Sequence, residues 1–219
     1  MNEPDLKLRP STPSGHDQRG DADRWRLPGA VALARDLAGR QLRAGDVAID
    51  ATVGNGHDTV WLASQVGPGG LVIGCDLQPA AIESGRARLE AAGLLARVRL
   101  VTGDHARLGE QVDPAVRRRV RAVMFNLGYL PGSDKSVVTG SGSTLAALAG
   151  LAEWLPDGAL VTVVAYPGHK GGAEERDAVL AWAARLDPDQ WRTQHWQALN
   201  RRRPAPELVA LERAVQRSD

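Results

Sequence analysis

The sequence predicts an α/β fold built on a doubly wound sheet of seven strands. Short apolar runs alternate with helix-like segments five times along the chain, as they do in a parallel sheet covered by helices on both faces. A glycine turn at residues 54–56 joins the first apolar run to the next helix-like segment, which is typical of a nucleotide or cofactor cradle. Two later runs, at 191–199 and 208–211, are joined by an arginine-rich loop and predict a closing antiparallel pair.

The individual elements follow from periodicity and turn residues. Pro28 suits a first helical turn, and apolar residues spaced three and four apart predict a helix that ends between Gly39 and Gly45. We expect the other helices after Gly56, from Gln78-Pro79, over 144–154 and over about 174–186. We expect the five strands before the closing pair at 47–49, 71–75, 98–101, 122–125 and 160–165.

Composition limits the class of protein. A chain of 219 residues and 23.4 kDa suits one α/β domain, which we place at 24–219, and residues 1–23 lack apolar periodicity and are expected to be a disordered tail. No apolar run approaches the roughly 20 residues that cross a bilayer, so we expect a cytoplasmic protein. The formal charge of +1 means that any contact with nucleic acid must come from a local basic patch. The only cysteine, Cys75, ends an apolar run and is expected to be a small buried strand residue.

The glycine turn discriminates between cofactors. A dinucleotide-binding fingerprint needs a third glycine where Thr59 stands, so an NAD-dependent oxidoreductase is disfavoured. An acid at a strand end followed by T-x-G-x-G resembles the first motif of the Rossmann-like class I S-adenosylmethionine-dependent methyltransferases. A strand-to-helix turn with no ligand is the alternative.

Two further acids follow predicted strands. Asp76 lies 22 positions after Gly54, close to the spacing at which a carboxylate accepts hydrogen bonds from ribose hydroxyls. Asp104 follows the third strand, where it could bind an adenine amine or cap the short helix after it.

The fourth strand ends in Asn126-Leu127-Gly128-Tyr129, which has the form that amino-group methyltransferases place beside the methyl donor. An amine attacks only through a free lone pair in line with the methyl group. The Asn126 Oδ1 and the Leu127 carbonyl could each accept one N–H and so turn that lone pair toward the methyl. Tyr129 would stack on a flat base, and Gly128 would permit close approach of the backbone. The alternative is that Asn126 satisfies backbone groups in a turn while Tyr129 packs.

Three motifs carry a resemblance to a known family. They are D-A-T-x-G-N-G-H-D-T at 50–59, F-N-L-G-Y-L-P-G-x-D-K at 125–135 and Y-x-G-H-x-x-G at 166–172. They resemble the bacterial family once labelled "putative rRNA methylase", whose known members methylate the aminomethyl group of 5-aminomethyl-2-thiouridine at the tRNA wobble position. The resemblance spans about 25–213. It implies S-adenosylmethionine as the methyl donor, S-adenosylhomocysteine as the product, and no metal.

The resemblance also implies the site residues. The donor cradle falls on Asp50, Thr52, Gly54, Asn55, Gly56, His57, Asp58, Thr59, Asp76, Gln78, Asp104 and His105. Asn126, Leu127 and Tyr129 are the implied catalytic residues. The acceptor pocket falls on Gly128, Asp134, Lys135, Ser136, Tyr166 and His169. Either His169 or Asp134 could act as a general base, and His169 could instead order its loop.

The expected partner is the anticodon stem-loop of tRNA. Lys135, Lys170, Arg201, Arg202 and Arg203 lie on loops expected near the carboxyl edge of the sheet, where they could contact phosphates while the flipped nucleoside enters the pocket. A methyltransferase acting on rRNA or a small amine, and a noncatalytic nucleotide-binding protein, remain as alternatives. The apolar helix before the first strand leaves room for a homodimer.

Overall fold

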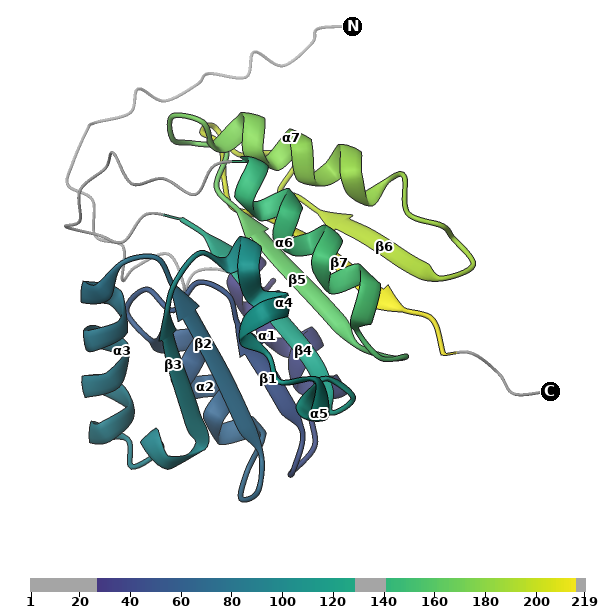
Figure 1. Cartoon of the computed structure of the whole chain (residues 1–219). Coiled ribbons are helices and arrows are strands. Elements are labelled where there is room, and N and C mark those ends of the chain that lie inside the picture. Colours follow the sequence, from purple (N-terminus) through teal and green to yellow (C-terminus); the bar gives the residue numbers. More distant parts are fainter. Residues whose placement is uncertain (1–26, 129–140, 216–219) are drawn as a thin grey trace, which may run out of the picture.

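The computed structural model describes residues 27–128 and 141–215. A central seven-stranded sheet carries helices on both faces (Figure 1). The strand order is β3-β2-β1-β4-β5-β7-β6. The predicted α/β fold with seven strands is therefore confirmed. The tail predicted at 1–23, Tyr129, Asp134, Lys135 and Ser136 lie outside the described residues.

The strands alternate with helices as the sequence pattern indicates. The strands are β1 (Val47–Asp50), β2 (Leu71–Asp76), β3 (Val98–Thr102), β4 (Val120–Leu127), β5 (Leu160–Ala165), β6 (Trp191–Trp196) and β7 (Glu207–Arg213). The α-helices are α1 (Ala30–Gln41), α2 (His57–Gln65), α3 (Pro79–Ala91), α4 (Leu108–Gln111), α5 (Pro114–Arg117), α6 (Ser141–Trp154) and α7 (Gly172–Ala183). Two single-turn 3₁₀ helices, η1 (Leu95–Arg97) and η2 (His105–Arg107), flank β3.

The order in which successive strands are added to the sheet reverses between β1 and β4. Strands β1, β2 and β3 follow one another toward one edge, and β4 then pairs with the other side of β1. These strands and β5 are parallel, whereas β7 is antiparallel to both β5 and β6. In an open α/β sheet, ligands bind at the carboxyl ends of the strands where the order reverses. The topology therefore directs attention to the ends of β1 and β4.

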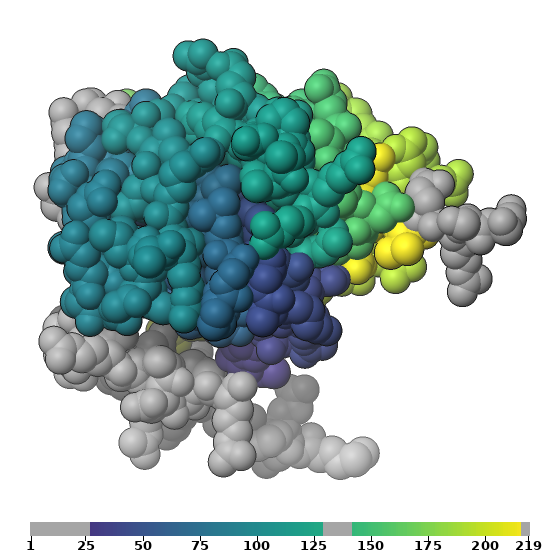
Figure 2. Space-filling model, turned by 60° about the horizontal axis from the view of Figure 1, so that its bottom comes forward, coloured from purple at the N-terminus to yellow at the C-terminus, as the bar shows by residue number. Residues whose placement is uncertain are grey.

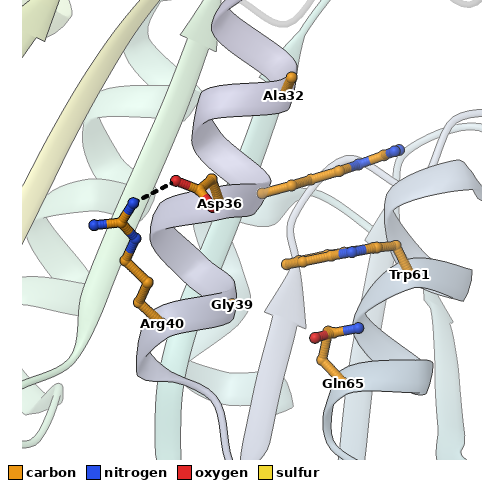
Figure 3. Close-up of a pocket in the computed structure, with 7 residues that line it drawn as sticks. Ala32, Asp36, Gly39, Arg40, Trp61 and Gln65 are labelled. Carbon is orange, nitrogen blue, oxygen red and sulfur yellow. Dashed lines mark hydrogen bonds and ion pairs between the residues drawn. The ribbon is translucent and has the colours of Figure 1, made fainter. Parts of the chain in front are cut away.

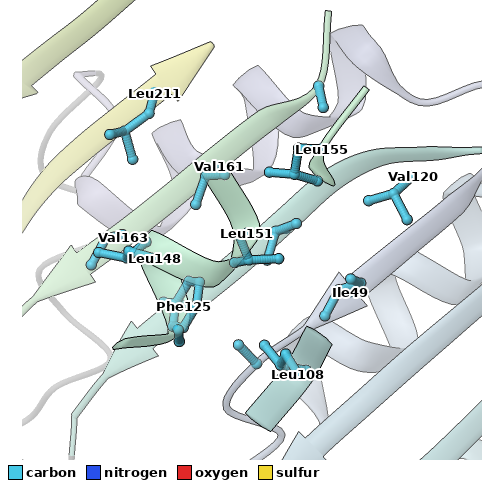
Figure 4. Packing of buried hydrophobic residues seen from close by; sticks show 14 of the residues in the cluster. Ile49, Leu108, Val120, Phe125, Leu148, Leu151, Leu155, Val161, Val163 and Leu211 are labelled. Atoms are coloured by element: carbon cyan, nitrogen blue, oxygen red, sulfur yellow. The ribbon is translucent and has the colours of Figure 1, made fainter. Parts of the chain in front are cut away.

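Alternation of side chains along the strands divides the core between the two faces. One cluster joins Val123 and Phe125 of β4 to α4, α6 and α7, and Figure 4 shows Val161 and Val163 of β5 with Leu148 and Leu151 of α6 in this cluster. The other cluster joins Ala122 and Met124 of β4 to α1, α2 and α3. Asn126 follows in the same alternation as Met124, so its side chain belongs to the face covered by α1 and α2.

The first helix contributes to the second half of the sheet. It contacts β4, β5 and β7. Viewed from below, the purple N-terminal part of the described chain lies between the blue and teal first half and the green and yellow second half (Figure 2). Its small residues Ala34 and Ala38 are completely buried, so α1 packs closely on the strands. A segment that precedes the first strand in sequence therefore lies beside the last strands.

Several boundaries differ from the sequence prediction. Strand β4 runs on through Asn126 and Leu127, which were expected in the loop after it. The short helix α5 carries Arg117, whose guanidinium lies over the Trp154 ring, 5.1 Å from the centroid. Arg117 thus packs on the protein and is not part of a fully solvated face.

In the two described ranges, no helix is long and apolar enough to cross a membrane.

Two glycines set the distance between α2 and α3. A Cβ atom added at Gly56 would lie 2.7 Å from the Gly85 Cα, and Gly56 also has a left-handed φ of +77°. We predict that Gly56→Ala is destabilising both through backbone strain and through the clash. Gly45→Ala is the matched control, because Gly45 also has a positive φ, +94°, but has no atom within 4 Å of its Cβ position.

Urea denaturation should show that Gly45→Ala lowers the free energy of unfolding by about 1–2 kcal/mol. Gly56→Ala should cost roughly 1–3 kcal/mol more, which is the usual cost of overpacking. Equal losses in the two variants would mean that α2 and α3 separate freely and that the close approach is not a constraint.

Candidate functional site

The turn after β1 is organised around the buried Asp50 carboxyl group. Its Oδ1 accepts a hydrogen bond from the Thr52 N–H at 3.1 Å, and its Oδ2 accepts one from the Thr59 hydroxyl at 2.6 Å. Asp50 is 1% exposed and Thr59 is fully buried. These two side chains therefore shape the turn from beneath and do not form its accessible surface.

Burial and neighbouring carboxylates raise the pKa of Asp50 to about 7. Burial is the largest cause, and Asp58 is the next. The hydrogen bonds from Thr59 and Thr52 act in the opposite direction because they stabilise the charged form. The acid at the end of β1 thus titrates near neutral pH.

Asp76 joins the ends of β1 and β2. Its Oδ2 accepts the Gly54 N–H at 2.8 Å, and its Oδ1 accepts the Gln78 N–H at 2.9 Å. Each carboxylate oxygen has a second lone pair, so both can still accept a hydroxyl group. Asp76 and Gln78 are half-buried, and the nearby His57 is exposed at the start of α2. Of the predicted cradle residues, Asp76, Gln78 and His57 therefore lie on an accessible rim.

Helix α2 leaves the turn without a side-chain cap at its N-terminus. Gly56 is its N-cap residue, and Asn55 is held by its carbonyl oxygen, which accepts a hydrogen bond from the Arg88 Nε at 2.7 Å. The first N–H groups of a helix carry a partial positive charge and suit an anionic or polar ligand.

At the end of β3, the Asp104 side chain has the capping role considered for it. Its Oδ1 caps η2 by accepting the Ala106 N–H at 2.9 Å, so the capping role is confirmed. The neighbouring His105 is buried, and burial lowers the pKa of its imidazole. The His105 ring lies edge-on to Phe125, with centroids 5.6 Å apart, so His105 supports the site from below.

At the end of β4, Asn126 is fixed by its backbone and by its side chain. Its N–H donates to the Thr52 Oγ1 at 2.7 Å, which ties β4 to the turn after β1. Its Nδ2 donates to the Asp58 Oδ2 at 3.2 Å. A carboxylate only accepts hydrogen bonds, so the Asn126 amide turns its nitrogen to Asp58 and its Oδ1 elsewhere.

Tyr166 borders Asn126 from the end of β5. Burial is the main cause that raises the pKa of the Tyr166 hydroxyl, followed by the charge of Asp58, while a hydrogen bond with the Asn126 side chain lowers it. A Cβ atom at Gly128 would lie 3.3 Å from the Tyr166 ring, so a side chain at this position would crowd Tyr166. Leu127 is buried, and its side chain belongs to the core on the opposite face.

His169 orders the loop that follows β5. Its Nδ1 lies 3.1 Å from the Lys170 carbonyl oxygen, and its ring packs against Gly172, where a Cβ atom would lie 2.8 Å from the Cε1. Because a carbonyl only accepts, the Nδ1 carries the proton in this contact. These contacts favour the loop-ordering interpretation of His169.

The loop between β6 and β7 lies at the same edge of the sheet. Glu207 at the start of β7 pairs with Ala165 at the end of β5, and a Cβ atom at Gly168 would lie 3.6 Å from the Pro204 carbonyl oxygen. Arg201 and Arg202, both exposed, are carried by this loop. The expectation that these arginines lie near the carboxyl edge is confirmed.

Sequence reasoning missed two residues at the site. Arg35 of α1 donates from its Nε to the Asp58 Oδ1 at 2.7 Å, although it precedes Asp58 by 23 positions and lies outside the recognised motifs. Leu77 is 50% exposed between Asp76 and Gln78, which makes it an apolar surface on the rim. An apolar residue directly after a strand-end acid was the available signal for Leu77. The sequence contained no local signal for Arg35.

Cys75 lies in the interior of the sheet, away from the accessible rim. Cys75 is buried, its Sγ–H donates to the Gly103 carbonyl at 3.2 Å, and burial with nearby acids raises the pKa of its thiol to about 12. This confirms the prediction of a buried strand residue. Among residues 27–128 and 141–215, no group of three His, Cys, Asp or Glu side chains could hold a metal ion.

A doubly wound sheet with polar strand ends gathered where its order reverses defines a protein of the Rossmann-like, cofactor-binding class. Residues 72–212 match the family model described as "Putative rRNA methylase". The chain belongs to this family.

Individual relatives agree with the family. A protein of Arabidopsis thaliana named "tRNA (mnm(5)s(2)U34)-methyltransferase, chloroplastic" is 42% identical over 190 residues, which are 83% of this chain and 68% of the relative. The structure titled "putative rRNA-methylase" from Clostridium thermocellum is 35% identical, with a TM-score of 0.81 and coverage of 86% of this chain and all of that one. A Streptococcus mutans structure, titled "a putative methyltransferase" in complex with SAH, is 32% identical, with a TM-score of 0.76 and coverage of 85% of this chain and 99% of that one.

The raised pKa of Asp50 predicts how stability depends on pH. Between about pH 4 and pH 7 the folded chain binds a proton at Asp50 that the unfolded chain releases, so stability falls as the pH rises through this range. Asp50→Asn removes the charge, and the replacement amide can still accept from the Thr52 N–H. In wild type, the free energy of unfolding should fall over this range by an amount on the order of a few kcal/mol, and we predict that it does not fall in Asp50→Asn.

Denaturation of both proteins across this pH range measures the difference. Asp36→Asn is the matched control, because the Asp36 carboxylate is exposed on α1 and pairs with Arg40. Parallel pH curves for wild type and Asp50→Asn would contradict the assignment of a near-neutral titration to Asp50.

Proposed function

We propose that this protein is an S-adenosylmethionine-dependent RNA methyltransferase, and that it methylates the aminomethyl nitrogen of 5-aminomethyl-2-thiouridine at the tRNA wobble position. The observation that carries the proposal is the oriented Asn126 amide at the topological switch point. The family match and the tRNA methyltransferase named among its relatives support the substrate class.

The residues of the cradle fit the donor. The Asp76 carboxylate has acceptor capacity for ribose hydroxyls, Leu77 offers an apolar surface beside it, and Asp104 lies at the end of the next strand. The open N-terminus of α2, with Asn55 before it and His57 at its start, provides N–H groups for the polar end of the donor, while the Gly54 N–H already donates to Asp76. When bound, S-adenosylmethionine supplies a methyl group on a sulfonium and is converted to S-adenosylhomocysteine.

The chain's own residues position the amine. The Asn126 Oδ1, turned away from Asp58, and the Leu127 carbonyl each accept one N–H of the neutral amine, so that its lone pair is directed toward the methyl group. Tyr166 closes the side of this position through its contact with Gly128. Tyr129, Asp134, Lys135 and Ser136 complete the acceptor pocket in the proposal, and His169 holds its loop in place.

Two alternative functions would give different results in a methyl-transfer assay. A methyltransferase for rRNA or a small amine would use the same cradle with a different acceptor, and supplying these acceptors in one assay separates them. A noncatalytic binding protein would bind the donor and transfer no methyl group to any of them.

We predict that Asn126→Ala abolishes methyl transfer while leaving donor binding intact. The expected loss is at least about 100-fold, because the amine is no longer held in line. The assay is nucleoside mass spectrometry of tRNA carrying 5-aminomethyl-2-thiouridine, in which wild type should add the mass of one methylene group. Calorimetry with S-adenosylhomocysteine measures donor binding in parallel.

Gln194→Ala is the matched control, because it removes an exposed amide from the edge strand β6. It should retain full activity. If wild type binds the donor but adds no mass to this nucleoside, the wobble-uridine assignment is wrong. Full activity of Asn126→Ala would reject the positioning role.

We predict that Arg202→Glu weakens tRNA binding and leaves donor affinity unchanged. Loss of a phosphate contact should reduce the slope of log K against log salt by about 1. Arg192→Glu is the control, because Arg192 is exposed near the other end of β6. Filter binding over a salt series measures both. A collapse of donor affinity in Arg202→Glu would instead assign this loop a structural role.

A further inference from the structure

Arg35 and Asp58 form an ion pair directly behind the proposed acceptor position. The Arg35 Nε lies 2.7 Å from the Asp58 Oδ1, and the two side chains are 33% and 8% exposed. Arg35 belongs to α1 and also lines a pocket between α1 and α2. Figure 3 labels Gly39 and Trp61 in the lining of the same pocket. One arginine therefore reaches from the helix surface to the buried carboxylate.

The other Asp58 oxygen holds Asn126. The Asn126 Nδ2 donates to the Asp58 Oδ2 at 3.2 Å, so the carboxylate bridges the guanidinium and the amide. The chain of contacts runs from α1 through the first turn of α2 to the end of β4. Because β4 and α1 share this face of the sheet, the bridge depends on the fold and not on neighbouring sequence.

The contact with Arg35 determines how Asp58 hydrogen-bonds to the Asn126 amide. An ionised carboxylate can only accept, which requires the Asn126 nitrogen to face it. Asp50, His57 and Tyr166 are the other titratable groups whose electrostatic interactions include Asp58, and they bring no permanent positive charge to it. Without the guanidinium, Asp58 would lose the contact that fixes its Oδ1, and its carboxylate would be free to turn away from the Asn126 nitrogen.

Loss of the Asp58 contact would free the Asn126 amide to turn over. In the reversed orientation the amide nitrogen would point to the acceptor position. An N–H group there would oppose the N–H groups of the amine and could not align its lone pair. The positive charge on α1 thus controls the polarity of a hydrogen-bonding group on β4.

We propose that Arg35 is a positioning residue that acts through Asp58 to keep the Asn126 oxygen turned toward the substrate amine. This role rests on the proposed function for its catalytic consequence. The orientation of the amide can be measured without any reaction.

The first measurement is the side-chain amide resonance of Asn126 in ¹⁵N-labelled protein, assigned through its loss in Asn126→Ala. Arg35→Gln should shift this resonance, and Arg35→Lys should restore part of the shift because the positive charge is kept. Arg40→Gln is the matched control on the same helix, since Arg40 pairs with the exposed Asp36 and not with Asp58 (Figure 3). An unchanged resonance in Arg35→Gln would overturn the proposal.

The second measurement is methyl transfer to the aminomethyl nucleoside. Arg35→Gln should lower kcat by about 10- to 100-fold with little change in the Kd for S-adenosylhomocysteine. In an Asp58→Asn background the same substitution should cost little more, because the intermediary is already removed. Additive losses, or a loss of donor affinity alone, would show that Arg35 acts by another route.

The two proposals fail in different ways. An inactive wild type with a shifted amide resonance in Arg35→Gln would reject the proposed function and keep the orienting role of Arg35. An active wild type whose kcat is insensitive to Arg35→Gln would keep the function and reject the positioning role.

Discussion

The site depends on the alternation of side chains along β4. Phe125 points into the core formed with α6 and α7, so the next residue must point to the opposite face. Asn126 is therefore directed to the side where α1 and α2 pack, and there it meets Asp58. A shift of one residue in the register of β4 would bury the amide in the apolar core and place Phe125 at the site. The apolar packing of one face thus fixes the polar chemistry of the other.

Three carboxylates then organise this polar face in different ways. Asp50 is surrounded by hydrogen bonds from the turn that it supports, and its pKa is raised to about 7 mainly by burial. Asp58 is compensated by Arg35 and orients Asn126. Asp76 accepts from two backbone N–H groups and remains accessible at the rim. The first acid shapes the turn, the second positions an amide, and the third is available to a ligand.

The antiparallel end of the sheet places basic residues beside this site. Glu207 at the start of β7 is buried and accepts hydrogen bonds from Arg176 at 2.6 Å and His195 at 2.8 Å, which anchors the base of the loop between β6 and β7. Because β7 runs opposite to β5, this loop lies at the carboxyl edge of the parallel strands. The reversal of strand direction therefore brings Arg201 and Arg202 to the edge where the proposed acceptor enters.

The sequence by itself determined the succession of strands and helices, the glycine turn, the acids at the ends of β1 and β2, and the motif that contains Asn126. These features are local, because strand alternation, helical spacing and turn residues act over a few positions. Only the tertiary structure decided that Asp50 and Thr59 are buried, that Asn126 donates to Asp58, and that Arg35 compensates this carboxylate. Those outcomes depend on which face each strand buries and on α1 packing against strands far away in sequence, and long-range packing of this kind leaves no periodic trace in the chain.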